Sequence, residues 1–368
     1  MKKIKKFDLS YSSKQITKYL KYAKQILNSG FLAESKMVKK FEEKFSKFTK
    51  IKYSNFVGSG TDALEISFKL VKKRKILLQT NNFFAAHVAV ENANKIPVYC
   101  DIELNTLGID VSKMEELLKK DKQIGAVCIV HTGGIISKDI LRIKKICKKY
   151  AVLLIEDAAH AHGSFKNKLH AGSFGDIGCF SFFSTKVMTT GEGGMLVTKN
   201  KYINKKIKSL KDFGRPKKDS WIRVMNGSNC KVTEFQAALG LLELDRFKNR
   251  IKKRYKLAKR IKTNLNNSNF KIYWPINQNS CSFYKLFIEH KTLDYNKVKK
   301  ELKKLNIPLS GQVWPFPLHN QPLYRNKSLK KFINTDIFVK KHFSFPIYPE
   351  LTYSDVDFMT NGLKQLIK

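Results

Sequence analysis

The sequence predicts an α/β protein in which helices cover both faces of a mostly parallel β-sheet, followed by a smaller C-terminal α+β domain. Three observations lead to this prediction. Between about residues 50 and 200, short apolar runs alternate with longer segments of helical periodicity, as in strands joined by crossover helices. The 368 residues, 42% of them apolar, are enough for two domains with buried cores. After residue 267 the apolar segments become shorter and more strand-like.

Four apolar runs in the first part of the chain are expected to form strands. They are short, rich in β-branched residues or leucine, and end in polar or glycine-containing turns. They are ILLQT (76–80), PVYCD (97–101), AVCIVH (126–131) and VLLIED (152–157). Helical spacing of apolar residues predicts helices at 61–73 and 139–150. Because ligands of parallel sheets bind at the carboxyl ends of strands, functional residues are expected there.

A long basic amphipathic pattern at 232–265 predicts a helix that connects the two domains. Beyond it we expect strands within 270–274 and 283–290, a helix over 294–306, and a last helix after Thr352. The predicted division is therefore a large α/β domain over residues 1–250, which includes an N-terminal helical segment, and a small α+β domain over 251–368.

The formal charge of +41 is the most unusual feature of the composition. Of the 71 basic residues 62 are lysines, dispersed over every segment, and only nine are arginines. Arginine is the side chain that nucleic-acid interfaces favour for bidentate contacts, so we expect no nucleic-acid partner. A polyanionic substrate such as a nucleotide-sugar would still be attracted by this charge.

Cysteine usage and hydropathy point to the cytoplasm. The six cysteines lie far apart with no C-x-x-C pair, which argues against a zinc site and against a disulfide-stapled secreted domain. No apolar run approaches the roughly 18–20 residues that span a bilayer. The basic N-terminal stretch is followed by polar residues rather than by the apolar core of a signal peptide. We expect a cytoplasmic protein with no membrane partner.

The segment GSGTDALEI (58–66) opens a predicted helix with two glycines and small hydroxyl residues. Backbone N–H groups and the helix dipole can there face an anion, typically a phosphate. An ordinary N-capped helix would have the same composition.

The segment EDAAHAHGS (156–164) follows the most hydrophobic predicted strand. Acids that end a buried strand are costly unless a cation or hydrogen-bond donors neutralise them. An aspartate facing a protonated heterocyclic nitrogen would be such a pair. The alternatives are a helix cap and a metal site that uses His160 and His162, but the spacing matches no familiar histidine-ligand motif, so no metal is predicted.

Lys186 stands out because of its flanking residues. The aromatic run CFSFF (179–183) delivers it to a loop rich in threonine and glycine, which can approach a ligand closely. A lysine amine that is partly removed from water is favoured in its neutral, nucleophilic form. Together with Asp157 and the phosphate loop, Lys186 completes the set that pyridoxal phosphate needs: a Schiff-base lysine, an acid at the pyridinium nitrogen and a phosphate cradle.

The segment FSFFSTKVMTTGEGGML (180–196) resembles the Schiff-base segment of the DegT/StrS-type sugar aminotransferases, which are fold-type-I pyridoxal-phosphate enzymes. The resemblance extends over nearly the whole chain and follows the order of the family's motifs. The other similar segments are SGFLAESKMVKKFEEKFSKF (29–48), GSGTDAL, EDAAHAHGS, NGSNCKVTEFQAALGLLELDR (226–246) and WPFPLHNQPLY (314–324). The family has a mostly parallel sheet of the seven-stranded type between helices.

The resemblance implies a role for each matching position. Lys186 would bind the cofactor covalently and move the proton, and Asp157 would keep the pyridine nitrogen protonated. Phe83 would stack on the cofactor ring, and His160 would lie near its phenolic oxygen. The phosphate would be bound by Gly60, Thr61 and Ser181, and Asp62 would also take part in binding the cofactor.

Two further positions extend the implied site beyond the large domain of one chain. Asn229 would reach the phosphate from a neighbouring subunit, so the active sites would be shared in a homodimer. His319 would face the sugar-nucleotide substrate. Residues outside this set, namely His131, His162 and Glu192, are interpreted as structural. Three of the implied residues have a structural alternative. Phe83 could be a core residue, Ser181 could bond to a neighbouring strand, and His319 could be a structural residue of a turn.

The implied reaction is transfer of an amino group, with glutamate as donor and 2-oxoglutarate as its product, to C3 or C4 of a nucleotide-linked keto-hexose. The product would serve lipopolysaccharide or other polysaccharide biosynthesis. One alternative is a sugar dehydratase of the same fold, in which histidine replaces the lysine that this chain keeps at position 186. A second alternative is a non-enzymatic regulator that retains the cofactor fold.

Overall fold

A seven-stranded sheet forms the centre of the large domain. The computed structural model describes residues 4–217, 220–266, 269–276, 278, 280–324 and 331–367. The strand order is β1-β9-β8-β5-β4-β2-β3, and only β9 runs antiparallel to its neighbours. The strands are β1 (Tyr53–Val57), β2 (Lys75–Gln79), β3 (Ile96–Cys100), β4 (Ile124–Val130), β5 (Leu153–Asp157), β8 (Ile177–Ser181) and β9 (Gly194–Thr198).

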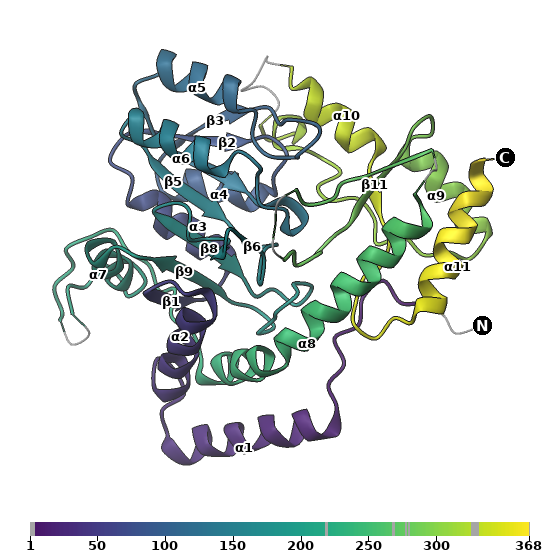
Figure 1. Cartoon of the computed structure of the whole chain (residues 1–368). Coiled ribbons are helices and arrows are strands. Elements are labelled where there is room, and N and C mark those ends of the chain that lie inside the picture. The colour runs from purple at the N-terminus through teal and green to yellow at the C-terminus, as the bar shows by residue number, and fades with distance from the viewer. Residues whose placement is uncertain are drawn as a thin grey trace.

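Helices cover both faces of this sheet, which makes three layers (Figure 1). One face packs against α3 (Gly60–Lys69), α4 (Phe84–Asn92) and α7 (Lys201–Leu210). The other packs against α2 (Lys36–Thr49), α5 (Val111–Lys120), α6 (Ile140–Lys149) and the first half of α8 (Glu234–Asn264). Two-sided coverage explains why the central strands are continuously apolar instead of alternating. The predicted α/β class with a mostly parallel sheet is confirmed.

Smaller elements complete the large domain. The helix α1 (Ser13–Ser29) starts at a capping box formed by Ser12 and Gln15 and packs along α8. A short hairpin of β6 (Phe165–Lys166) and β7 (Leu169–His170) follows β5, and the 3₁₀ turn η1 (Thr132–Gly134) follows β4. Two elements that the sequence patterns did not indicate, β1 and β9, pair with each other along their whole length.

The helix α8 belongs to two hydrophobic cores. Its first half contributes Ala237, Leu241 and Phe247 to the core beneath the sheet. Its second half contributes Leu257 and Ile261, among others, to the core of the small domain, and Figure 1 shows it running from one domain to the other. The predicted connecting helix is thus present. The boundary at residue 250 stays a prediction, because no break in the helix marks it.

The small domain has a three-stranded sheet of order β10-β11-β12. Its elements are β10 (Phe270–Ile272), α9 (Tyr295–Lys304), η2 (Leu318–Asn320), α10 (Ile333–Lys341), β12 (Phe343–Ser344), α11 (Tyr353–Lys364) and η4 (Gln365–Ile367), with β11 (Phe287–His290) in the centre. The predicted strand at 283–290 is only half right. Phe283 has a φ of +44°, and the carbonyls of Phe283 and Tyr284 accept hydrogen bonds from the Arg254 side chain, so the ladder begins only at Phe287.

The topology brings several chain segments to one edge of the large sheet. β1, β2, β4, β5 and β8 run in the same direction, so their carboxyl ends lie together. The α3 N-terminus, the α4 N-terminus and the loop after β8 all begin at this edge. Among the described residues, no helix is both long and apolar enough to cross a membrane.

Candidate active site

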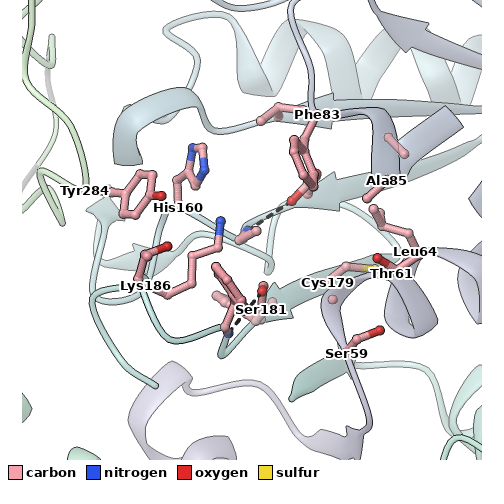
Figure 2. A pocket seen from close by; sticks show the side chains of 18 of the residues that line it. Ser59, Thr61, Leu64, Phe83, Ala85, His160, Cys179, Ser181, Lys186 and Tyr284 are labelled. Carbon is pink, nitrogen blue, oxygen red and sulfur yellow. Dashed lines mark hydrogen bonds between the residues drawn. The ribbon is translucent and has the colours of Figure 1, made fainter. Parts of the chain in front are cut away.

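A cavity of about 520 Å³ lies at the carboxyl edge of the sheet. Its wall includes seven of the residues singled out in the sequence: Gly60, Thr61, Phe83, Asp157, His160, Ser181 and Lys186. The small domain closes the other side with Tyr284, Lys285, Gln312, Val313 and Trp314. Figure 2 shows His160 and Tyr284 on one side of the cavity, Ser59 and Thr61 on the other, and the Lys186 side chain between them.

The hydroxyl-lined end of the cavity is built on the N-terminus of α3. Ser59 caps this helix, and its Oγ accepts a hydrogen bond from Asp62 N at 3.0 Å. A Cβ atom at Gly60 would lie 2.7 Å from Ser181 Cβ, so only glycine allows the helix start to approach the end of β8. The first N–H groups of a helix have no partner within the helix, and together with the serine and threonine hydroxyls they form a fitting cradle for a phosphate.

Asp157 ends β5 and is only 7% exposed. Its Oδ1 accepts a hydrogen bond from Ala159 N at 3.1 Å. Burial raises the pKa of Asp157, and the hydrogen bond from Ala159 and the nearby Lys186 amine offset part of this effect. A buried carboxylate at a cavity wall calls for a positively charged partner, and the protonated nitrogen of a pyridine ring is a fitting one.

Lys186 lies in the loop after β8, five residues beyond the end of the strand at Ser181. A backbone bond from Lys186 N to Phe183 O, 2.9 Å long, forms a tight turn. The half-buried side chain extends into the cavity, where its Nζ lies 4.9 Å from the centre of the Tyr284 ring. The amine is thus held by an aromatic face rather than by a carboxylate, which leaves its nitrogen available for covalent chemistry.

His160 is buried, and its ring is stacked between Tyr284 and Trp314, at centroid distances of 4.1 and 5.3 Å. Gly133 N donates to its Nδ1 at 3.4 Å, which assigns the proton to Nε2. Burial lowers the pKa of His160 well below its usual value, and the Lys186 cation adds to this effect. The ring is therefore neutral and can donate one hydrogen bond from Nε2, as a phenolic oxygen would require.

Phe83 is the N-cap residue of α4 and is 46% exposed. Its ring stacks on Phe84 at a centroid distance of 4.0 Å, and it forms part of the cavity wall above the Lys186 side chain (Figure 2). The alternative that Phe83 is simply part of the core does not fit this exposure. An exposed aromatic ring at a cavity mouth is suited to stack on a planar ligand.

The structure does not bring the remaining predicted residues into the cavity wall. Asp62 lies in the first turn of α3, and burial raises its pKa. Asn229 is exposed in the loop before α8, paired with Asp212. His319 is buried in η2, where its Nε2 lies 2.9 Å from Asp336 Oδ1. Their predicted roles stay predictions.

The sequence patterns missed the small-domain side of the cavity. Tyr284, Lys285, Gln312, Val313 and Trp314 come from two separate segments. Only Trp314 lies in a segment that was recognised from the sequence, at the start of WPFPLHNQPLY (314–324), and it was not singled out there. A positive φ of 50° at Trp314 and the bonds from Arg254 near Tyr284 place these side chains, and neither can be read from the local sequence. Glu192, interpreted from the sequence as structural, also lies in the wall.

Comparison with known proteins places the chain in a family. The sequence model of the DegT/DnrJ/EryC1/StrS aminotransferase family matches residues 14–364, so the chain belongs to this family. It is 31% identical over 360 residues to the UDP-4-amino-4,6-dideoxy-N-acetyl-beta-L-altrosamine transaminase of Campylobacter jejuni, covering 93% of each chain. It is 29% identical over 367 residues to the spore coat polysaccharide biosynthesis protein SpsC of Bacillus subtilis, covering 94% of this chain and 93% of SpsC.

Solved structures agree with the predicted fold and cofactor. Bacillus subtilis NtdA with bound cofactor PMP superimposes with a TM-score of 0.88 at 25% identity, over 97% of this chain and 82% of NtdA. PMP is pyridoxamine phosphate, the amine form of pyridoxal phosphate. The predicted family, fold type and aminotransferase class are confirmed.

Proposed function

We propose that this protein is a pyridoxal-phosphate-dependent aminotransferase that transfers an amino group to a keto-sugar linked to a nucleotide. The observation that carries the proposal is the shared wall of one cavity, on which the Lys186 amine, the buried Asp157 carboxylate and the α3 N-terminus meet. Pyridoxal phosphate requires an amine for covalent attachment, an acid at its ring nitrogen and a cradle for its phosphate, and these three groups supply them. Three relatives whose names contain a nucleotide-linked amino sugar support a keto-sugar as the acceptor.

When bound, the cofactor supplies an electron sink that lets an amino group leave one carbon skeleton and enter another. The α3 N-terminus and Ser181 would bind its phosphate, and Asp157 would hold a proton on its ring nitrogen. Phe83 would stack on one face of the ring. His160, neutral and protonated at Nε2, would donate to the phenolic oxygen. The Lys186 amine would bind the coenzyme and then carry the proton between the substrate carbon and the coenzyme.

The active site is expected to be shared between two subunits. Asn229 is exposed and absent from the cavity wall of its own chain, so it can reach a cofactor only in a neighbouring subunit. The same loop exposes Trp221, Ile222 and Val224, with Trp221 99% exposed. A cluster of exposed apolar side chains on a loop is typical of a protein–protein interface, and a second copy of the chain is the partner that gives Asn229 a role.

The cellular setting follows from chemistry rather than from a targeting signal. All six cysteines are buried and free, as expected in a reducing compartment, so we place the enzyme in the cytoplasm. Glutamate is the proposed donor, and His319 is proposed to contact the sugar-nucleotide when the subunits assemble. An amino-sugar product would serve the biosynthesis of a surface polysaccharide.

A direct experiment tests the proposal. The protein is purified with pyridoxal phosphate, reduced with borohydride and digested, and the labelled peptide is mapped. We expect the label on Lys186. Glutamate should then bleach the visible absorbance of the unreduced protein and release 2-oxoglutarate. A nucleotide-linked 4-keto or 3-keto hexose should show the small mass change expected when its keto oxygen is replaced by an amino group and a hydrogen. A label on another lysine, or no response to glutamate, contradicts the proposal. A dehydratase would instead remove a hydroxyl group from the sugar and add no nitrogen to it.

A further inference from the structure

A second cavity of about 250 Å³ adjoins the proposed active site. The two cavities share four lining residues: Thr185, Lys186, Tyr284 and Lys285. The second cavity, called here the basic chamber, is further bounded by residues 6–9, by one face of α8, and by Ser310, Ile347 and Tyr348. Residues 6–9 reach it because the N-terminal segment lies beside the small domain (Figure 1). The predicted site includes no residue of the chamber except Lys186.

The acidic side chains of the basic chamber already have partners. Glu243 Oε1 accepts hydrogen bonds from Arg246 Nε at 2.7 Å and from Tyr11 Oη at 2.9 Å. Asp8 Oδ2 lies 2.9 Å from Lys5 Nζ. Neither carboxylate is therefore free to neutralise the other cations that line the chamber.

Two cations that line the chamber, the buried Arg254 and the half-buried Lys285, have no acidic partner among the described residues. The hydrogen bonds of Arg254, which is 7% exposed, go from Nε and Nη2 to backbone carbonyls at 282–284. Lys285 donates to the carbonyl oxygen of Ser310 at 2.7 Å and to its hydroxyl. In the part of the chain that the structure describes, neither cation belongs to a salt bridge. Burial, together with the nearby charges of Arg254 and Lys186, lowers the pKa of Lys285 to about 8.

Uncompensated buried charges are costly to a folded protein. Two positive charges beside a cavity create a positive electrostatic potential there, and this potential favours binding of an anion. A carboxylate that entered the chamber would replace the missing acidic partner. It would also be held near Lys186, because Lys186 and Tyr284 line both cavities.

We infer that the basic chamber binds the distal carboxylate of a dicarboxylic amino donor, with Lys285 and Arg254 as its ligands. This inference rests on the proposed aminotransferase function and adds the donor subsite to it. The diphosphate of a nucleotide-sugar is separated from its keto carbon by the hexose. A five-carbon dicarboxylate instead places its second carboxylate a few bonds from the amino group that reacts.

Binding of glutarate, an unreactive five-carbon dicarboxylate, tests the inference. Calorimetry on the cofactor-loaded wild-type protein should show glutarate bound about 10- to 100-fold more tightly than butyrate, the gain expected for charge-assisted hydrogen bonds to one carboxylate. Lys285→Met keeps the length and apolar character of the side chain and should abolish that preference. Lys291→Met is the matched control, since Lys291 is exposed and follows β11 whereas Lys285 precedes it, and this variant should bind like wild type.

Steady-state kinetics with a dicarboxylic and a monocarboxylic amino donor test the same inference. Lys285→Met should raise the KM for glutamate about 10- to 100-fold, with little change for a monocarboxylic donor such as alanine and none in the visible spectrum of the bound cofactor. Unchanged glutarate affinity in Lys285→Met overturns the inference. The inference is also overturned if Lys285→Met loses binding of inorganic diphosphate but keeps binding of glutarate. The chamber would then bind the nucleotide and not the amino donor. A wild-type protein that takes up no cofactor would instead refute the proposed function, whatever the glutarate result.

Discussion

The two walls of the active-site cavity differ in origin. The large-domain wall comes from strand ends and helix starts at one edge of a parallel sheet, where Gly60, Asp157 and Ser181 are held by backbone geometry. The small-domain wall comes from irregular segments around Tyr284 and Trp314, held by side-chain contacts across the domain junction. The first wall therefore suits a cofactor that is the same in every turnover. The second suits substrates, which must enter and leave.

Among the changes to the large-domain wall, removal of the Lys186 amine should cause the largest loss of activity. Lys186→Ala loses both the covalent attachment and the proton carrier, and the acid–base part alone contributes about 10²–10⁴ in rate. Activity should fall by at least that factor, measured as 2-oxoglutarate released from glutamate. Lys201→Ala, at an exposed position, serves as the control and should keep the wild-type rate. Normal turnover in Lys186→Ala would remove this residue from the mechanism.

Asp157→Asn should separate catalysis from stability. The variant cannot hold the pyridine nitrogen protonated, so we expect a loss of at least about 10²-fold in rate. Burial raises the pKa of Asp157 in the folded state, so stability falls as the pH rises through that pKa and the charged carboxylate destabilises the fold at neutral pH. The cofactor-free variant should therefore melt about 2 °C higher than wild type at pH 7.

The pH dependence checks this explanation. Below about pH 4, where the carboxyl is protonated in both the folded and the unfolded chain, the stability difference should disappear. Calorimetric melting of both cofactor-free proteins between about pH 3 and 8 measures this difference. A variant that is less stable at every pH would show that the carboxylate supports the fold, as a purely structural residue would.

Asn229→Ala tests whether the large-domain wall is completed by a partner subunit. The variant alone should lose activity, by about 10-fold if one phosphate hydrogen bond is removed. Mixing it with Lys186→Ala and allowing subunits to exchange should restore about a quarter of the wild-type rate, because half of the dimers then contain one intact site. No recovery in a mixture shown to contain heterodimers would place Asn229 outside the active site.

Tyr284 tests the small-domain wall, where the smallest effect is expected. Tyr284→Leu removes the ring that faces Lys186 Nζ and stacks on His160, and cation–π contacts contribute about 0.5–2 kcal/mol. We expect a rise in the KM of either substrate of up to about 10-fold with a small change in kcat. Tyr284→Phe keeps the ring and should stay within about twofold. Equal losses in both variants would mean that the hydroxyl, not the ring, matters.

The sequence predicted the large-domain side of the molecule better than the small-domain side. The strands β2 to β5 and the helix α8 were predicted closely, because apolar periodicity and turn residues are local properties. β1 and β9 were not, since a strand pair made by residues 140 positions apart has no local signature. Lys186, Asp157 and Gly60 were predicted as site residues because short motifs at strand ends contain them, and the structure places all three on one cavity wall. Tyr284 and Lys285 were not, because Arg254, some 30 residues away, positions them.

The amino-acid sequence by itself determined the fold class, the family and the residues at the strand ends, because each depends on neighbours close along the chain. Only the tertiary structure decided which side chains close the cavity and where uncompensated positive charge collects. The physical reason is that burial and electrostatic neutralisation depend on all groups within a few ångströms in space. Lys285 is one lysine among 62 in the sequence, and only its position beside Arg254 and Lys186 makes it a candidate ligand.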